Sequence, residues 1–169
     1  MKFKLTTNTK VVFGKKLFQI QACVDFAHIK KGALGGYVEK EENLSQYGNA
    51  WVSGNARVYG NAWVSGDARV SSNARVYGNA RVYGDARVSG DARVYGNAEV
   101  LWFSKVGSEN GTLTACRDKD GGIWVSRGCF NGSIDDFKSK VESTHGNNKT
   151  AKEYKLLIDF IELRFSEND

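Results

Sequence analysis

The chain has 169 residues, of which 41% are hydrophobic and 12% aromatic, so its composition is that of a folded domain and excludes intrinsic disorder. It contains 19 glycines and no proline, which excludes collagen-like and proline-rich structures. The formal net charge of +5 favours anionic partners only weakly. No segment approaches the roughly 20 apolar residues of a membrane span. The opening MKFKLTTNTK also lacks the apolar core of a signal peptide.

The three cysteines, Cys23, Cys116 and Cys129, are odd in number and form no CxxC motif. This pattern predicts neither a disulfide framework nor a structural zinc site. Reduced, buried thiols are typical of cytosolic proteins, so we expect a cytoplasmic location.

Residues 1–45 are predicted to form N-terminal strands and an irregular first coil. This segment holds eight lysines and four acids, and therefore has a net charge of +4. Alternation and aromatic content predict strands at KFKLT (2–6) and KLFQIQACVDF (16–26). Residues 32–46 would then cover the exposed edge of the repeat that follows. Gly35 and Gly36 in this stretch are interpreted as turn glycines.

Residues 46–103 contain a six-residue repeat of the form Gly–Asn/Asp–Ala–x–Val–Tyr/Ser. Alanine recurs every six positions from 50 to 98, and valine recurs from 52 to 100. A period of six excludes a helix, because helical patterns recur every 3.6 residues. Ala and Val are two positions apart and so point to one side of a short strand, while the Gly–Asn or Gly–Asp pair suits a corner. The repeat therefore predicts a parallel β-helix.

This unit resembles the hexapeptide repeat of left-handed β-helices, which stack three hexads, about 18 residues, into each triangular coil. The variant with Asn-Ala or Asp-Ala after glycine is most similar to YdcK-like hexapeptide proteins. The flanks LGGYVEKEENLSQYGNAWV and THGNNKTAKEY are similar to segments that accompany such repeats in bacterial and phage proteins. The resemblance implies a left-handed β-solenoid of about three regular coils, in the cytoplasm of a bacterial host cell.

A coil of this length stacks residues that are 18 positions apart, and three such coils span roughly 14 Å. The corner asparagines Asn61, Asn79 and Asn97 would then form a column whose amides bond along the stack. Three columns of valine would fill the core, namely Val52, Val70 and Val88; Val58, Val76 and Val94; and Val64, Val82 and Val100.

Residues 104–169 are predicted to form an α+β cap on the last coil, or an oligomerisation element, made of a hairpin and two helices. TLTACR (112–117) and IWVSRGCF (123–130) flank the turn DKDGG. Ser133 is predicted to cap a first helix that Gly146 ends. Thr150 and Glu153 are predicted to form a capping box for a second helix. Its apolar stripe should pack on the hairpin, and consists of Tyr154, Leu157, Ile158, Ile161 and Phe165.

The three outer faces of the coils carry different side chains. The first carries Ser53, Ser71 and Ser89 beside Trp51, Arg69 and Arg87, and the third carries Trp63, Arg81 and Glu99 beside Ser65, Tyr83 and Leu101. The second is the most regular, with a column of arginines beside a column of tyrosines. A phosphate can bind stacked guanidinium groups while a base stacks on a ring. The predicted ligand-binding residues are therefore Arg57, Arg75, Arg93, Tyr59, Tyr77 and Tyr95.

Two other interpretations of the second face remain open. Arginine and tyrosine are enriched at subunit interfaces, so the face is also suited to oligomerisation. It would equally keep a solenoid soluble. Stacked arginines about 5 Å apart repel one another, and cation–π contacts with the tyrosine rings offset part of that cost.

Catalytic and metal sites are not expected. Left-handed hexapeptide proteins include acyltransferases with a histidine base near the coils and a carbonic anhydrase with a three-histidine zinc site. The only histidines in this chain are His28 and His145, so we expect no catalytic residue, metal or cofactor. No P-loop, GxSxG or HExxH motif occurs. Asp118 and Asp120 are interpreted as acids of a hairpin, because the pattern of a calcium-binding loop is missing. Gly121 and Gly122 are interpreted as turn glycines.

Three functions of different classes fit these observations. The leading hypothesis is a non-enzymatic homo-oligomer, dimer or trimer, that binds a small phosphate-bearing molecule such as a nucleotide. The resemblance to phage-borne hexapeptide proteins extends this to a sponge that sequesters a nucleotide immune signal, an anti-defence role. The alternatives are a structural or protein-interaction scaffold and a hexapeptide-type acyltransferase. Neither a membrane nor a nucleic acid is an expected partner, because duplex binding usually uses about six or more phosphate contacts.

Overall fold

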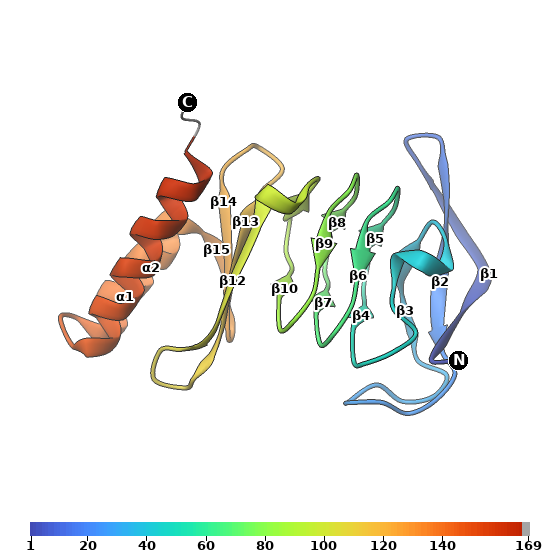
Figure 1. The fold of residues 1–169 in the computed structure, drawn as a ribbon, viewed down its shortest axis with the longest axis horizontal. Coiled ribbons are helices and arrows are strands. Elements are labelled where there is room, and N and C mark those ends of the chain that lie inside the picture. The colour runs from blue at the N-terminus through green and yellow to red at the C-terminus, as the bar shows by residue number, and fades with distance from the viewer. Residues whose placement is uncertain (167–169) are drawn as a thin grey trace.

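The computed structural model describes residues 1–166, which form three parts in a row along one axis (Figure 1). A β-solenoid lies between an N-terminal sheet and a C-terminal lobe of four strands and two helices. The β-solenoid predicted from the repeat is confirmed, with about three turns and a spacing of about 18 residues. None of the described helices is long and apolar enough to cross a membrane.

The solenoid is built from two-residue strands, each ending at a valine of the repeat. Strands 18 residues apart pair in parallel, so β4, β7 and β10 form one sheet, β6 and β9 a second, and β5, β8 and β11 part of a third. Their bounds are β4 (Trp51–Val52), β5 (Arg57–Val58), β6 (Trp63–Val64), β7 (Arg69–Val70), β8 (Arg75–Val76), β9 (Arg81–Val82), β10 (Arg87–Val88) and β11 (Arg93–Val94).

The core is a stack of valine and alanine side chains inside the coils. Two predicted columns are confirmed by strand pairing, namely Val52, Val70 and Val88, and Val58, Val76 and Val94. In the third, parallel pairing joins only the first two members, although Val100 is buried in the same core. Val64 pairs with Val82, but Val100 begins β12 (Val100–Val106), which pairs antiparallel with β13 (Gly111–Arg117).

The corners of the coils explain where the repeat ends. Seven corner glycines adopt φ between 59° and 70°, which glycine reaches without steric cost. Gly96 instead has φ of −141°, and the 3-10 turn η2 (Asn97–Glu99) follows it. The predicted column of corner asparagines is therefore formed only by Asn61 and Asn79, where the side-chain amide of Asn61 donates to Oδ1 of Asn79 at 3.3 Å. Asn97 departs from the column and accepts a hydrogen bond from the amide of Arg81 at 2.8 Å.

The N-terminal segment extends one sheet of the solenoid. β1 (Phe3–Val12) and β2 (Lys15–Ala22) form an antiparallel hairpin, and β3 (Leu34–Val38) joins it to β5. The interpretation of Gly35 and Gly36 as turn residues is wrong, because both are buried in β3. A Cβ on Gly35 would lie 2.5 Å from the side chain of Ile20, so this strand packs too closely for any other residue.

The first coil is closed by the short turn η1 (Glu41–Asn43) and by the N-terminus. The buried amide of Asn43 donates to the carbonyls of Gly60 and Ala62 at 3.1 and 2.8 Å. The Nζ atom of Lys2 donates to the carbonyl of Ala50 at 2.9 Å. Burial lowers the pKa of this ammonium group to about 8.

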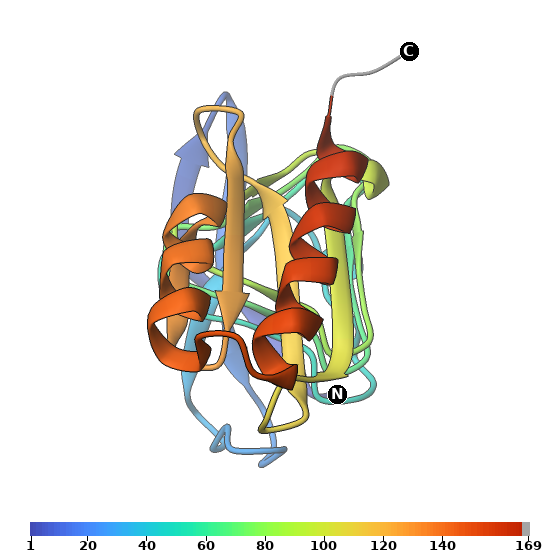
Figure 2. The ribbon, with the colours of Figure 1, turned by 90° about the vertical axis from the view of Figure 1, so that its left-hand side faces the viewer.

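The C-terminal lobe is larger than the predicted hairpin. β14 (Ile123–Arg127) and β15 (Phe130–Ser133) complete the antiparallel sheet β12-β13-β14-β15. The predicted turn at residues 118–122 does connect β13 to β14. Two helices, α1 (Ile134–His145) and α2 (Lys149–Phe165), lie side by side on the face of this sheet that points away from the solenoid (Figure 2).

The helix ends test the capping predictions. Ser133 caps α1 by accepting from the amide of Asp136, and Gly146 ends it with φ of 55°, as predicted. The capping box at Thr150 is wrong, because the side chain of Asn148 accepts from the amide of Ala151 and caps α2 two residues earlier. Glu153 accepts from the amide of Gly107 instead, and so ties α2 to the sheet.

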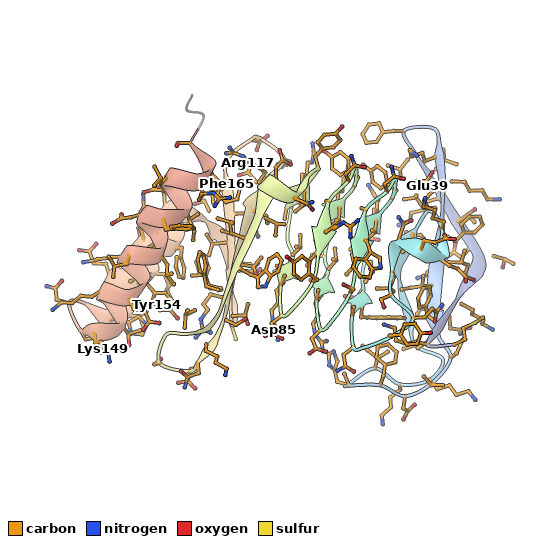
Figure 3. The ribbon with its side chains drawn as sticks, viewed as in Figure 1. Glu39, Asp85, Arg117, Lys149, Tyr154 and Phe165 are labelled. Carbon is orange, nitrogen blue, oxygen red and sulfur yellow. The ribbon has the colours of Figure 1, made fainter. Side chains whose placement is uncertain are left out.

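The apolar stripe of α2 packs as predicted. Tyr154, Ile158, Ile161 and Phe165 are buried and Leu157 is partly buried, in a cluster with Leu113 and Val125 of the sheet. Arg117 fixes the end of the helix by donating to the carbonyl of Phe165 at 2.6 Å, beside the ring of that residue (Figure 3).

The described cysteines are unpaired, and their burial differs. Burial raises the pKa of the Cys116 thiol to about 12, so this thiol stays protonated. Cys23 is half-buried and Cys129 is exposed, so the expectation of three buried thiols is wrong for Cys129.

Candidate functional site

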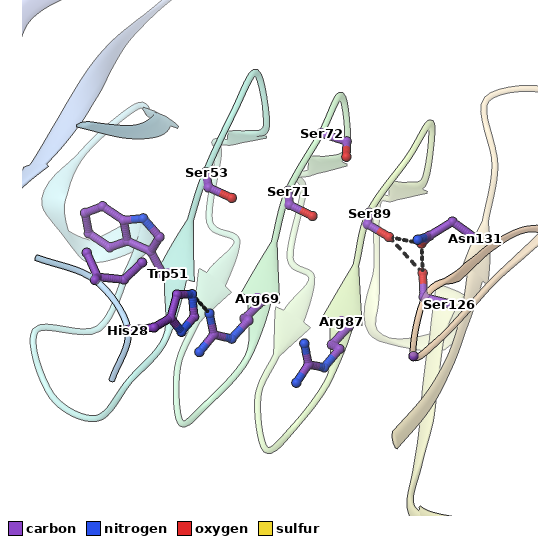
Figure 4. Close-up of a pocket in the computed structure, with 12 residues that line it drawn as sticks. His28, Trp51, Ser53, Arg69, Ser71, Ser72, Arg87, Ser89, Ser126 and Asn131 are labelled. Carbon is purple, nitrogen blue, oxygen red and sulfur yellow. Dashed lines mark hydrogen bonds between the residues drawn. The ribbon is translucent and has the colours of Figure 1, made fainter. Parts of the chain in front are cut away.

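A hollow lies over the first face of the solenoid, above β4, β7 and β10 (Figure 4). Its floor combines a column of serines with a column of cationic side chains, and its volume is about 360 Å³. We call it the serine–arginine groove. It is lined by His28, Ile29, Trp51, Ser53, Arg69, Ser71, Ser72, Arg87, Ser89, Ser126, Gly128 and Asn131.

One end of the groove is closed by the loop after β2. Phe26 and Ile29 exchange backbone hydrogen bonds of 3.0 and 2.8 Å, which fixes a tight turn at His28. The ring of Phe26 packs edge-on against Trp51 at 5.4 Å, so the turn is anchored on the first strand of the floor. Trp51 is only 3% exposed, and its indole therefore serves as support for this wall.

The other end is closed by the β14–β15 hairpin. The Oγ atoms of Ser89 and Ser126 are 2.9 Å apart, and both hydroxyls contact Oδ1 of Asn131. The amide of Arg87 donates to Oγ1 of Thr114 at 2.8 Å, so β13 docks on the last strand of the floor. The groove is therefore held between two caps of non-repeating sequence.

The floor carries unpaired positive charge. Arg69 and Arg87 are paired residues of neighbouring parallel strands, so their guanidinium groups start from positions about 4.8 Å apart. Burial and the neighbouring Arg87 lower the pKa of Arg69, although Asp67 at the corner raises it in part. An amide of Asn49 bonds the carboxylate of Asp67 at 2.8 Å. No carboxylate lies among the lining residues of the described groove.

His28 contacts this charge directly, since its Nε2 atom is in hydrogen-bonding contact with Nη1 of Arg69 (Figure 4). A guanidinium group can only donate, so Nε2 accepts and the proton of the neutral ring lies on Nδ1. An imidazole in this state helps to orient Arg69 along the floor.

Ser72 is the irregular corner of the solenoid. The repeat places glycine at this position in the coils before and after, at Gly54 and Gly90. Ser72 nonetheless adopts φ of 59°, a left-handed conformation that costs a serine energy. Its side chain lines the groove. Local rules are most often broken at functional positions, so this corner points to the groove as a site.

The predicted arginine–tyrosine column lies on the second face, and the structure brings its members together. Arg57, Arg75 and Arg93 are paired residues of β5, β8 and β11. The rings of Tyr59 and Tyr77 stack at 5.1 Å, and Tyr77 meets Tyr95 edge-on at 5.3 Å.

The exposure of this column falls sharply toward the N-terminal end. Tyr95 is 59% exposed and Tyr59 only 6%, because Leu17 and Tyr37 of the N-terminal sheet pack on it. Burial raises the pKa of the Tyr59 hydroxyl, against the lowering influence of the neighbouring arginines. The ring of Phe13, at the tip of the hairpin, lies 5.6 Å from the guanidinium of Arg75. Only the C-terminal end of the column therefore offers a free ring face.

The two histidines lie far apart in the fold. His28 lines the groove, whereas His145 is in the last turn of α1, with its ring 5.9 Å from that of Tyr154. Within residues 1–166, no group of three or more His, Cys, Asp or Glu side chains could hold a metal ion.

Sequence reasoning identified the serine and arginine columns of the first face but not the groove above them. His28 and Asn131 are separated by most of the chain, so no local pattern connects them. The one available signal was the serine at position 72, where the repeat otherwise has glycine.

The stacked coils define the chain as a β-solenoid protein with an open groove on one face. Residues 50–66, 74–90 and 86–100 match the family model of the YdcK beta solenoid repeat. The central repeats of this chain therefore match this repeat model, as the sequence resemblance implied. A search of curated proteins found no match to the chain.

Proposed function

We propose that the chain is a non-enzymatic binding protein for a small phosphate-bearing molecule, held in the serine–arginine groove. One observation carries this proposal. Arg69 and Arg87 lie next to each other on neighbouring strands, in a groove whose lining residues include no carboxylate. Neighbouring guanidinium groups repel one another, so an anion between them relieves that repulsion. It also gains charge-assisted hydrogen bonds, the strongest kind that a phosphate forms with protein.

The rest of the groove suits the uncharged part of such a ligand. Ser53, Ser71 and Asn131 offer hydroxyl and amide groups that can bond sugar hydroxyls. The floor is three strands wide, about 10 Å from first to last, and both ends are walled. A single nucleotide or another sugar phosphate fits this length, whereas a polymer does not. Because Trp51 is buried, recognition would rest on phosphate and hydroxyl groups rather than on base stacking.

The sponge hypothesis is the narrower form of this proposal. A sponge must bind a nucleotide signal tightly and release it unchanged, and the size and charge of the groove support that role. The anti-defence context adds the requirement that the bound molecule be an immune signal of the bacterial host.

The arginine–tyrosine column is the second candidate binding site for the same class of ligand. Arg93 and Tyr95 lie at its open end, where a phosphate and a base could be held together. The two sites are on different faces of the solenoid, so they can be tested separately with matched arginine variants.

The acyltransferase alternative is favoured by one observation, the position of His28 in the groove. A catalytic base must present its free nitrogen to a substrate hydroxyl. Arg69 occupies Nε2 of His28, and this contact favours a binding role. An acyltransferase would hydrolyse or transfer from an acyl-CoA and lose that activity in His28→Ala, whereas the binding proposal expects no turnover.

The test begins with native mass spectrometry of whatever small molecule copurifies with the chain. Isothermal titration calorimetry then compares nucleoside monophosphates and diphosphates, a sugar phosphate and inorganic phosphate with the matching unphosphorylated nucleoside. We expect binding only of the phosphorylated compounds. Arg69→Gln and Arg87→Gln should each weaken it at least about tenfold, since a hydrogen bond to a charged group contributes about 1.5–3 kcal/mol.

Arg75→Gln and Arg93→Gln are the matched controls, because they remove the same group from the same repeat position on another face. Unchanged affinity in these controls supports the groove. Loss of binding in Arg75→Gln, and in the more severe Arg75→Glu, would place the ligand on the arginine–tyrosine column instead. If no phosphorylated compound binds, the proposed function is wrong and the scaffold alternative gains support.

A further inference from the structure

The third face of the solenoid carries a row of large aromatic side chains outside the groove, and three of them are exposed. Tyr47, Trp63 and Tyr83 are 85%, 38% and 51% exposed. Trp102 continues the row beyond the last coil; it is half-buried against the core, and its ring lies 4.7 Å from that of Tyr83 in an edge-on contact. We call these four residues the aromatic face. Large exposed aromatic groups in one row mark a surface that another molecule covers.

The aromatic face is hollowed on either side of Trp63. On the N-terminal side a pocket of about 420 Å³ is lined by Trp63, Tyr47 and the turn at Glu42. On the C-terminal side a pocket of about 370 Å³ is lined by Arg81, Tyr83 and Trp102. The solenoid strands beneath, β6 and β9, form a sheet of only two strands, whereas the second face continues into the N-terminal hairpin.

The charges on this face are separated along the solenoid axis. Glu41 and Glu42 lie at the N-terminal end, and both are exposed. Arg81 lies on the other side of Trp63, with its guanidinium 5.9 Å from the indole ring. Within the part of the chain that the structure describes, none of these three residues forms an ion pair. Glu99, at the repeat position one coil beyond Arg81, instead accepts from the amide of Tyr95.

We propose that the aromatic face binds a second copy of this chain, related by a two-fold axis that passes near Trp63 and runs perpendicular to the solenoid axis. Such an axis reverses the order of acid, aromatic and base, so Glu41 and Glu42 of each copy meet Arg81 of the other. The two Trp63 rings then pack at the centre, where aromatic anchors contribute most to binding. Tyr47, the most exposed of the four, faces the second copy's pocket between Arg81 and Trp102.

This arrangement is independent of what the groove binds, because the groove is on another face of the solenoid. It leaves both grooves of the dimer open. It also gives the separated charges and the exposed rings a common role, which a surface kept only for solubility does not need.

A competing surface exists on α2 and provides the matched control. Leu156, Phe160 and Leu163 are exposed to 72%, 42% and 70% along one side of the helix. Leucine is under-represented among the residues that dominate interfaces, whereas tryptophan, tyrosine and arginine are enriched. Charge order also favours the aromatic face, because acids and arginine lie on opposite sides of its centre.

The experiment measures the mass of the full chain in solution by light scattering and sedimentation over a dilution series. We expect twice the monomer mass of 18.7 kDa for the unaltered protein. Trp63→Ala should raise the dimer dissociation constant at least about thirtyfold, the effect of losing one interface hot spot. Leu156→Ser with Leu163→Ser should leave it unchanged. Circular dichroism checks that each variant keeps the fold.

Charge reversal gives the most specific readout. Arg81→Glu should produce monomers, and adding Glu42→Arg to the same chain should restore the dimer, because both ion pairs return with opposite polarity. The proposal is overturned if the unaltered chain is monomeric at about 100 µM, a concentration at which an interface of ordinary affinity is occupied. It is also overturned by a trimer mass, by dimers that survive both Trp63→Ala and Arg81→Glu, or by dimers that dissociate only in the leucine variant.

Discussion

Replacing Ser72 with glycine is expected to stabilise the protein and to weaken ligand binding in the groove. Ser72 holds φ of 59° at a corner where Gly54 and Gly90 stand in the adjacent coils. A left-handed conformation costs a residue with a Cβ about 1–2 kcal/mol. Glycine avoids this cost, but it loses about 0.5–1 kcal/mol of stability because it gives up more conformational freedom on folding. The net gain should therefore be about 0.5–1 kcal/mol.

Urea unfolding measures this change, and a gain of 1 kcal/mol corresponds to a rise of about 2–4 °C in Tm for a chain of this size. Gly54→Ser is the matched reverse change, since Gly54 has φ of 61° and a Cβ there would come no closer than 3.4 Å to Ser72. It adds backbone strain without a clash, and should destabilise the protein by about 1 kcal/mol. Calorimetry with the phosphorylated ligand then measures the affinity of Ser72→Gly.

Two results would refute the reasoning. If Ser72→Gly is less stable than the unaltered chain, the serine stabilises its corner and the strain argument fails. If its affinity for the ligand is unchanged, the side chain of Ser72 does not take part in binding. Stability that rises while affinity falls is the pattern of a residue kept for function at the expense of the fold.

Three further predictions concern stability and are tested by urea unfolding. Asn148→Ala should cost about 1 kcal/mol through loss of the helix cap, whereas Thr150→Ala should change stability by less than about 0.5 kcal/mol. Val76→Ala should cost about 2 kcal/mol, because it empties a fully buried position in the middle coil. The pKa of Lys2 is about 8 in the folded protein and 10.5 as its ordinary value, so between these pH values the unfolded chain binds more protons. Stability should therefore rise with pH across that window, by about 3 kcal/mol at most, and Lys2→Met should lack this rise.

The solenoid could be predicted because each repeat makes the same local choice. Alanine and valine always alternate with outward residues, and glycine stands at every corner of the repeat except Ser72. Such agreement between local preference and global fold leaves few alternatives. The prediction of a further regular coil failed at Gly96 and Val100, where the corner conformation and the strand pairing change although the six-residue sequence pattern continues. Docking of the C-terminal sheet decides that exit, and no repeat pattern encodes it.

The candidate site was less accessible to sequence reasoning. The arginine–tyrosine column is regular, but regularity does not show that Leu17 and Tyr37 bury Tyr59 at one end. The groove, in contrast, does not follow from any regular pattern, because its walls come from His28 and Asn131 in two unrelated segments. Burial of one column and enclosure of the other are both consequences of tertiary packing, which a single sequence does not display.

The repeats and the caps determine different properties of the serine–arginine groove. The hexads determine which groups line the floor, because every coil places one outward residue before each valine and one after it. The caps determine its length, because the turn at His28 and the hairpin at Asn131 lie at opposite edges of the sheet that β4, β7 and β10 form. A solenoid without them would offer an open row of cations that suits an extended polyanion. With both caps in place the same row is closed at about three strands, and that closure is the reason the groove suits one small phosphate-bearing molecule.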